Sequence, residues 1–316
     1  MKMRIPVVVL FAPTASGKTA LSIKLFGKSS LFCFKGRAEL VSADSMQVYK
    51  GLDIGTAKPD ENEKNELPHH LIDILEPDEQ FSVADFVSMA DSCCREIYGR
   101  GKIPLVAGGT GFYIRNFIMG LPETPVSDEK IRNSLKERIK NEGNEALYAE
   151  LKSVDAESAA KINVNDGYRI CRALEVFYST GKPRSSFKIS SKMREDYDFK
   201  VIVLETERTK LYEKINFRVE KMFEHGLAGE VRALYEKGFG KSAPGMQAIG
   251  YREWFLDDGS LRSDVENVMQ EIKRDSRKYA KKQYTYISGI PGALKIDASD
   301  EEKMIFEVRK ALKAIF

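Results

Sequence analysis

The chain has 316 residues, which is enough for one large or two modest domains with a substantial buried core. Its 50 lysine and arginine residues nearly balance 47 aspartate and glutamate residues, and the net charge of +3 excludes nucleic-acid binding through a global basic field. The four cysteines show no Cys-x-x-Cys spacing and two are adjacent, which argues against a disulfide framework and a structural zinc site. No apolar run has the length of a secretory signal core or a membrane span, so we expect a cytoplasmic protein without a membrane partner.

The first predicted element is a strand over residues 7–11 that leads into a phosphate-binding loop. Ala-Pro-Thr-Ala-Ser-Gly-Lys-Thr follows the strand and precedes a helical pattern over residues 20–25. A loop at a helix N-terminus points unpaired N–H groups and the positive end of the helix dipole at an anion. In the G-x-x-x-x-G-K-[ST] pattern, Lys18 reaches the outer phosphates and the Thr19 hydroxyl joins a Mg²⁺ shell. The predicted phosphate-binding residues are Ala12, Pro13, Thr14, Ala15, Ser16, Gly17, Lys18 and Thr19.

This loop departs from its pattern at the first position, where Ala12 replaces a glycine. A Cβ is costly at positive φ, so either Ala12 has a negative φ or the turn is strained. An ordinary Gly/Ser turn is the alternative interpretation of the whole segment. The position between a strand and a helix favours the phosphate loop.

Short apolar runs alternate with helical patterns through the first 120 residues, which indicates a parallel α/β sheet with ligand chemistry at the carboxyl ends of its strands. A charged helical texture then begins, with Ser127 as its predicted cap, and the chain returns to the sheet near residue 199. We predict a P-loop NTPase-like core domain from residues 1–122 and 197–316, flanked by helices, with an all-helical insertion domain at 123–196. Strands are predicted over residues 7–11, 40–42, 70–74, 103–107 and 199–204.

Two polar groups follow predicted strands. Asp44 comes after the second strand, where a single aspartate is more often a helix cap than a base. Gly-Gly-Thr-Gly at 108–111 follows the strand 103–107; its glycines let a backbone approach a substrate, and a flexible turn is the alternative. A small-molecule kinase would usually end such a strand with an acidic residue for Mg²⁺, which this strand lacks.

A local basic patch lies near the C-terminus. Residues 273–282 contain six basic side chains and one acid, and four of them recur at helical spacing: Arg274, Arg277, Lys278 and Lys281. Such a stripe suits a phosphate backbone, although a solvated lysine-rich face is the competing interpretation. Tyr284 and Tyr286 are expected either to stack on bases or to lie in a closing strand.

In combination, these motifs resemble the tRNA dimethylallyltransferase family, also called tRNA isopentenyltransferases. No Cys/His zinc finger follows residue 290, so the resemblance is to the short bacterial or organellar form. It implies transfer of a dimethylallyl group from dimethylallyl diphosphate to N6 of adenosine 37, beside the anticodon, in tRNAs that read codons beginning with U. The phosphate loop then holds a diphosphate leaving group instead of ATP. The matching segments span residues 42–59, 68–73, 106–113, 165–176, 180–183, 248–252 and 276–283.

The resemblance implies roles for individual residues. An exocyclic adenine amine is a weak nucleophile, so Asp44 is implied to accept its proton as the new bond forms. Charge develops on the leaving diphosphate, and Lys18, Thr110 and Arg218 are implied to stabilise it. Mg²⁺ near Thr19 is the implied cofactor. A solvated helix arginine is the ordinary interpretation of Arg218, and its family position favours the diphosphate role.

The same resemblance implies that the anticodon stem-loop of tRNA enters a channel through the core from one side and the diphosphate from the other. The adenine must leave the base stack to reach Asp44. Gln283 is expected to offer its amide to a base edge. The implied tRNA-binding residues are Asp44, Ser45, Met46, Gln47, Thr110, Arg132, Tyr168, Arg169, Arg172, Gln247, Gly250, Tyr251, Arg252, Arg277, Lys278, Lys281, Lys282 and Gln283.

Two other functions remain open from the sequence. An adenylate isopentenyltransferase would prenylate free AMP, ADP or ATP with similar catalytic residues, but it would need neither a basic helix nor a helical insertion. A P-loop small-molecule kinase, or a nucleotide-switched binding module, would use the loop for ATP or GTP. We expect a monomer.

Overall fold

The computed structural model describes residues 4–124, 128–187, 190 and 192–313. The chain divides into two compact units, a core unit of Met1–Ile118 with Arg194–Phe316 and an insertion unit of Met119–Met193. These divisions fall a few residues before the boundaries expected from the sequence.

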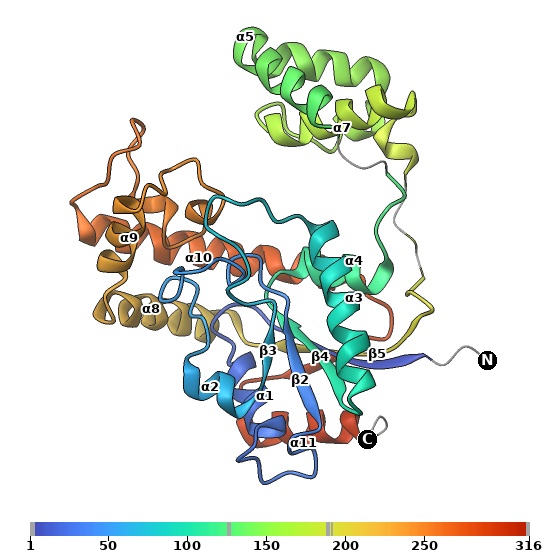
Figure 1. Cartoon of the computed structure of the whole chain (residues 1–316), viewed down its shortest axis with the longest axis vertical. Coiled ribbons are helices and arrows are strands. Elements are labelled where there is room, and N and C mark those ends of the chain that lie inside the picture. The colour runs from blue at the N-terminus through green and yellow to red at the C-terminus, as the bar shows by residue number, and fades with distance from the viewer. Residues whose placement is uncertain (1–3, 125–127, 188–189, 191, 314–316) are drawn as a thin grey trace. The chain divides into compact units, whose positions relative to one another are not determined.

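The core unit is built on one parallel sheet of six strands in the order β3-β2-β4-β1-β5-β6 (Figure 1). All neighbouring strands pair in parallel, which confirms the predicted α/β class. The predicted third strand is too long because Leu71 and Asp73 adopt positive φ and end the extended backbone after His70. The sixth strand has no counterpart among those predicted. The strands are β1 (Ile5–Phe11), β2 (Ala38–Ser42), β3 (His69–His70), β4 (Ile103–Gly108), β5 (Tyr197–Glu205) and β6 (Leu294–Asp297).

Helices cover both faces of this sheet. The core helices are α1 (Lys18–Phe26), α2 (Glu61–Glu66), α3 (Val83–Gly99), α4 (Gly111–Met119), α8 (Arg208–Glu224), α9 (Leu227–Glu236), α10 (Val265–Ile287) and α11 (Glu301–Leu312). On one face, α1 and α11 share an apolar cluster with Leu10 and Ile202 of the strands. On the other, Phe117 of α4 contacts Phe86 of α3 and Phe199 of β5. Burial of both faces explains why the strands are continuous apolar runs.

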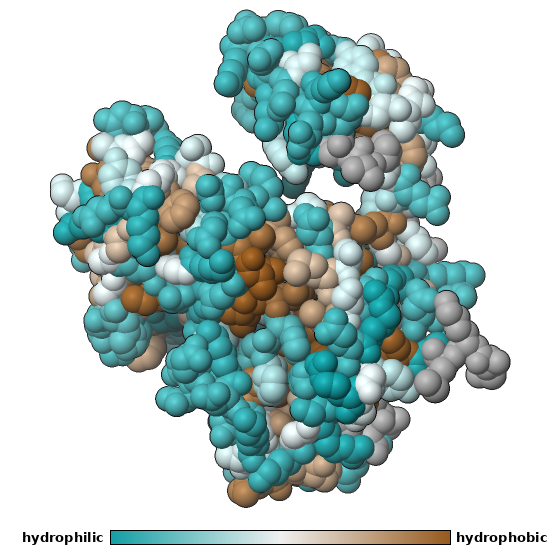
Figure 2. Space-filling view, viewed as in Figure 1, coloured by the Kyte–Doolittle hydropathy of each residue, from teal (hydrophilic) through white to brown (hydrophobic). Residues whose placement is uncertain are grey.

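The outside of the core unit is mostly hydrophilic on the viewed face, with apolar side chains gathered towards its middle (Figure 2). Short 3-10 turns at Gly245–Gln247 and Arg252–Trp254 connect α9 to α10. Across the described ranges, no helix combines the length and the apolar character needed to span a bilayer.

The long helix α10 continues through the C-terminal aromatic residues. Tyr284 packs edge-on against Phe11, and Tyr286 packs against Phe112. The alternative prediction of a closing strand at these tyrosines is therefore wrong, because the helix continues to Ile287.

The described part of the insertion unit contains helices and no strand. They are α5 (Glu129–Val154), α6 (Ala156–Ala159) and α7 (Gly167–Thr180), with a 3-10 turn at Arg184–Ser186. Leu147 and Leu151 of α5 pack with Leu174 of α7 in the centre of the unit. The N-cap of α5 is Asp128, whose side chain accepts backbone N–H groups of the first turn, whereas Ser127, the predicted cap, lies outside the described residues.

Candidate active site

The carboxyl ends of three adjacent strands meet at one edge of the sheet. Ser42 of β2 pairs with Ala107 of β4, and Phe11 of β1 pairs with Gly108 of β4. Because this register brings the three strand ends level, the segments that follow them lie side by side. The phosphate loop, the Asp44 segment and the Thr110 turn therefore share one site.

The phosphate loop between β1 and α1 bends through two residues with positive φ, Ala15 at 61° and Gly17 at 77°. Ala12 is fully buried and does not have a positive φ, so its Cβ adds no backbone strain. The strained position is Ala15. The Ser16 hydroxyl is buried and forms no hydrogen bond with any described residue, and such a group is normally partnered. The loop therefore has an unused donor, as expected of an anion site.

Two cationic side chains, Lys18 and Arg218, share the interior of the site. Lys18 Nζ donates to the carbonyl oxygen of Pro13 at 3.0 Å, and Arg218 Nη2 donates to that of Thr56 at 3.2 Å. Burial and the neighbouring Arg218 charge lower the pKa of Lys18 to about 8, against the opposing effect of Asp44. Burial also lowers the pKa of Arg218. Arg218 is thus no solvated helix arginine, and this pair of like charges is suited to a multiply charged anion.

Asp44 turns one carboxylate oxygen towards its own backbone. Its Oδ1 accepts the N–H groups of Met46 at 2.9 Å and Gln47 at 3.4 Å. Its Oδ2 forms no hydrogen bond within the described part of the chain and remains able to accept a proton from a ligand. The Thr110 Oγ1 accepts the N–H of Ser45 at 3.0 Å, which fixes this hydroxyl against the Asp44 segment.

The Gly108-Gly109 pair lines the smaller pocket with its backbone, and the space that a side chain would need at either position is filled by protein. A Cβ on Gly108 would lie 2.1 Å from the carbonyl oxygen of Ala43, and one on Gly109 would lie 2.5 Å from Nε2 of Gln283. The buried Gln283 amide donates to the Gly109 carbonyl at 2.7 Å and accepts the N–H of Thr14 at 3.1 Å. Gln283 therefore clamps the turn after β4 to the phosphate loop through one donor and one acceptor of its amide, and it also lines the smaller pocket.

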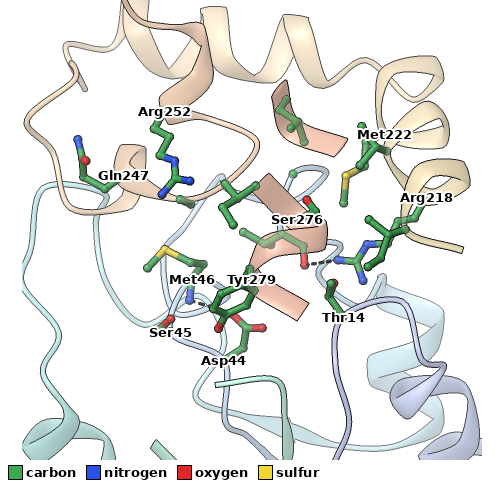
Figure 3. Close-up of a pocket in the computed structure, with 17 residues that line it drawn as sticks. Thr14, Asp44, Ser45, Met46, Arg218, Met222, Gln247, Arg252, Ser276 and Tyr279 are labelled. Carbon is green, nitrogen blue, oxygen red and sulfur yellow. Dashed lines mark hydrogen bonds between the residues drawn. The ribbon is translucent and has the colours of Figure 1, made fainter. Parts of the chain in front are cut away.

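Two adjoining pockets meet at these side chains. The larger, of about 240 Å³, has apolar walls from α8 and α10 and includes Gln247 and Arg252 (Figure 3). The smaller, of about 100 Å³, lies over the phosphate loop and includes Lys18 and Thr19. A ligand in either pocket therefore faces the same carboxylate and the same guanidinium. Five residues line both pockets: Thr14, Asp44, Thr56, Arg218 and Tyr279.

The sequence analysis missed Tyr279 as a residue of this site. Its ring lines both pockets, and burial together with the Asp44 charge raises its pKa to about 12. Ser276, Tyr279 and Gln283 recur at positions i, i+3 and i+7 of α10, the face opposite the basic stripe. This helical spacing could have predicted a site-facing side of the helix, but the sequence analysis assigned the functional role to the basic residues on the opposite side.

Two of the predicted tRNA-binding residues are parts of the protein interior. Tyr251 is fully buried, and its hydroxyl donates to Glu230. Gly250 has a φ of 105° and donates its N–H to the buried Glu253 at 2.8 Å. Both residues lie inside the fold in this structure, where the Tyr251 ring fills the space beside Gly55, so their tRNA contact stays a prediction.

The predicted basic stripe lies on α10. Asp275 is ion-paired with several of its members, at 3.0 Å from Arg274 and 3.5 Å from Lys278. Arg277 is half-buried and donates to Asn216 at 2.6 Å. The exposed members are Arg274, Lys278 and Lys281, and the neighbouring Lys282 is also exposed.

The remaining predicted RNA contacts belong to the insertion unit. Tyr168 is 82% exposed at the start of α7. Arg132 and Arg172 lie 3.8 Å and 3.0 Å from the buried carboxylate of Glu175, which orients both guanidinium groups. Arg169 is exposed on the first turn of α7.

A phosphate loop and a carboxylate that face each other across a two-part pocket, on a parallel sheet, define a phosphate-binding α/β transferase. The chain belongs to the IPP transferase family, whose model matches residues 47–289. This finding confirms the family and the enzyme class expected from the sequence motifs.

Similar proteins extend over nearly the whole chain. The tRNA dimethylallyltransferase of Acetivibrio thermocellus is 41% identical over 314 residues, 98% of both chains. The tRNA dimethylallyltransferase 2 of Geotalea daltonii is 43% identical over 288 residues, 90% of this chain and 85% of the relative. The crystal structure of the Bacillus halodurans tRNA isopentenylpyrophosphate transferase superposes with a TM-score of 0.69 at 37% identity, covering 98% of this chain and 96% of that one. A eukaryotic dimethylallyltransferase acting on tRNA gives 0.79 at 29% identity, covering 98% and 78%.

Proposed function

We propose that this enzyme transfers the dimethylallyl group of dimethylallyl diphosphate to N6 of adenosine 37 in tRNAs that read codons beginning with U. The observation that carries this proposal is the pair of pockets that meet at Asp44 and Arg218. The smaller pocket has the donors for a diphosphate, and the larger pocket has apolar walls and polar ends suited to an everted adenine. One chain supplies both pockets, which supports a monomeric enzyme, and we propose that it acts on tRNA in the cytoplasm.

The proposed reaction is a displacement at the first carbon of the prenyl group. N6 of adenine attacks this carbon, the carbon–oxygen bond to the diphosphate breaks, and the N6 proton passes to Oδ2 of Asp44. The leaving diphosphate takes the bonding electron pair and is stabilised by Lys18, Arg218 and the N–H groups of the phosphate loop. The Thr110 hydroxyl, which accepts the Ser45 N–H at 3.0 Å, is proposed to assist at the reacting centre, although Thr110 lines neither pocket.

Mg²⁺ fits the chemistry of the smaller pocket. The Thr19 hydroxyl lines this pocket and would hold the ion together with diphosphate oxygens. The ion supplies charge neutralisation for the leaving group when it is bound. In the described ranges no three His, Cys, Asp or Glu side chains cluster as a metal site, which suits an ion bound mainly through phosphate and water.

The substrate preference is tested by offering the purified protein labelled dimethylallyl diphosphate with either an unmodified tRNA bearing adenosine 37 or free AMP. We expect label in the tRNA alone. Label in AMP alone would assign the chain to the adenylate isopentenyltransferases. An inosine at position 37 removes the acceptor amine and is the matched control for the tRNA.

The exposed lysines of α10 are proposed to contact the tRNA backbone. Lys278→Glu is expected to weaken tRNA binding and to reduce the slope of log affinity against log salt by at least about one, because one cationic contact is lost. Filter binding over a series of salt concentrations measures the slope. Lys303→Glu on α11, equally exposed but outside both pockets, is the control. An unchanged slope for Lys278→Glu would mean that the stripe is only a solvated face.

Donor capture is expected to depend on the protonation of Lys18. Its pKa is about 8, so the Lys18 side chain carries its positive charge below this pH and loses it as the pH rises through 8. The value of kcat/KM for dimethylallyl diphosphate should therefore fall about tenfold per pH unit above pH 8, because it reports the free enzyme. The kcat should stay flat there, since bound diphosphate raises the pKa of Lys18. Lys18→Arg should remove the alkaline fall, and a fall that persists would assign it to another group.

A further inference from the structure

The loop of residues 53–58 carries the backbone partner of Arg218. The Thr56 carbonyl oxygen accepts Nη2 of Arg218 at 3.2 Å and Nε2 of Gln47 at 3.3 Å. Within the described residues this carbonyl is the hydrogen-bond acceptor of the Arg218 guanidinium. The position of the Arg218 guanidinium, whose charge acts on Lys18, therefore depends on where this loop lies.

The Glu230 carboxylate of α9 accepts four hydrogen bonds, three from this loop and one from Tyr251, whose hydroxyl also accepts the Gly55 N–H at 3.1 Å. Its Oε2 accepts the N–H groups of Asp53 at 3.1 Å and Ile54 at 2.8 Å. Its Oε1 accepts the N–H of Gly55 at 3.2 Å and the hydroxyl of Tyr251. These four donors match the four lone-pair sites of an ionised carboxylate.

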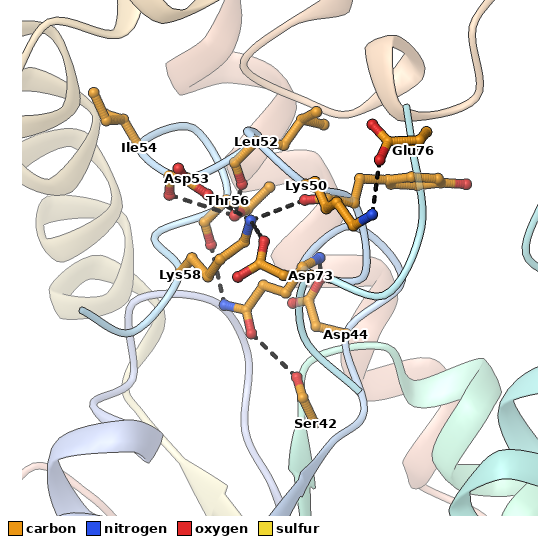
Figure 4. Close-up of polar contacts among 12 residues, drawn as sticks. Ser42, Asp44, Lys50, Leu52, Asp53, Ile54, Thr56, Lys58, Asp73 and Glu76 are labelled. Atoms are coloured by element: carbon orange, nitrogen blue, oxygen red, sulfur yellow. Dashed lines mark hydrogen bonds and ion pairs between the residues drawn. The ribbon is translucent and has the colours of Figure 1, made fainter. Parts of the chain in front are cut away.

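A second tether prevents the loop from leaving when one contact is lost. The nearly buried Lys58 ammonium donates to the Tyr49 carbonyl oxygen at 2.8 Å and pairs with Asp53 and Asp73 (Figure 4). Loss of the Glu230 contacts should therefore shift the Thr56 carbonyl without unfolding the segment.

We propose that Glu230 is a positioning residue for diphosphate binding, which acts by holding the 53–58 loop so that the Thr56 carbonyl fixes Arg218 beside Lys18. This inference rests on the proposed function for the identity of the anion. The two buried cations repel each other without a ligand, so the guanidinium needs a fixed acceptor to be preorganised for the diphosphate. Glu230 itself touches no substrate, because it does not line either pocket.

The test is the affinity of inorganic diphosphate, the reaction product, measured by titration calorimetry without tRNA or catalysis. Glu230→Gln replaces one acceptor oxygen with an NH₂ group that cannot accept the loop N–H groups. We expect its diphosphate affinity to fall about tenfold or more, the KM for the donor to rise in parallel, and the KM for tRNA to stay unchanged. Glu236→Gln makes the same chemical change at an exposed position of the same helix and should match the wild type.

The decisive measurement is made in the Arg218→Gln background. If Glu230 acts through Arg218, Glu230→Gln should cause no further loss of diphosphate affinity there, whereas additive losses would overturn the proposal. Glu230→Asp keeps the charge but shortens the side chain, so it should give an intermediate loss of diphosphate affinity. It replaces Glu230→Gln in the test if thermal denaturation shows that the glutamine variant does not fold. Wild-type affinity in both Glu230 variants would also overturn the proposal. Failure of the wild type to bind diphosphate would instead contradict the proposed function.

Discussion

Replacing Asp44 with asparagine is expected to slow prenyl transfer by about 10²–10⁴-fold, the usual contribution of a general base. The asparagine oxygen can still accept the N–H groups of Met46 and Gln47, so the turn that positions the side chain should remain. The amide cannot accept the N6 proton, so the chemical step loses its base. Single-turnover transfer of label from dimethylallyl diphosphate to tRNA measures this step directly.

The asparagine variant also separates catalysis from binding. The affinity for tRNA should match the wild type, because the shape of both pockets is kept. Asp78→Asn changes an exposed aspartate outside both pockets and should leave the transfer rate unaltered. A single-turnover rate in Asp44→Asn equal to that of the wild type would remove Asp44 as the base.

Local patterns were sufficient for the central strands of the sheet and for its phosphate loop. Strand β1 is buried along most of its length, so its apolar run and the glycine and lysine after it are visible within about fifteen residues. The end of β3 was missed because positive φ at Leu71 and Asp73 depends on packing that no local pattern records. The strand β6 was missed because its pattern is short and only Ile296 in it is buried.

The second half of the site could not be predicted locally because its contacts join distant parts of the chain. Gln283 bonds a backbone amide 269 residues earlier, and Glu230 bonds one 175 residues earlier. The residue type of Gln283 and the family resemblance at Tyr251 suggested RNA contacts, and neither indicated that Gln283 bridges two loops or that Tyr251 is buried. Residues at strand ends, such as Asp44, were predicted because a parallel sheet brings its strand ends to one edge regardless of the conformation of the loops.

The electrostatics of the site follow from two cations placed close together in a pocket, where protein atoms replace part of their hydration. Each charge is disfavoured by burial, and the Arg218 charge further disfavours that of Lys18. This arrangement costs stability in the free enzyme and is relieved when an anion with several charges binds. Donor affinity and leaving-group stabilisation therefore come from the same pair of side chains.

Arg218→Gln is accordingly expected to lower kcat/KM for dimethylallyl diphosphate by about 10²–10³-fold, with losses in both kcat and donor affinity. The glutamine amide can still donate to the Thr56 carbonyl, but it carries no charge for the diphosphate. Steady-state kinetics with varied donor measure the loss. Arg232→Gln, at an exposed position of α9, is the matched control.

Arg218→Gln should also change the pH dependence of kcat/KM, an effect that a purely structural defect would not produce. The Arg218 charge lowers the pKa of Lys18, so its removal should raise that pKa and move the alkaline fall of kcat/KM to higher pH. The direction follows because a neutral neighbour no longer repels the ammonium proton. A pH profile of Arg218→Gln whose alkaline limb stays at the wild-type position would show that the two cations do not interact, and would remove the basis for a shared diphosphate site.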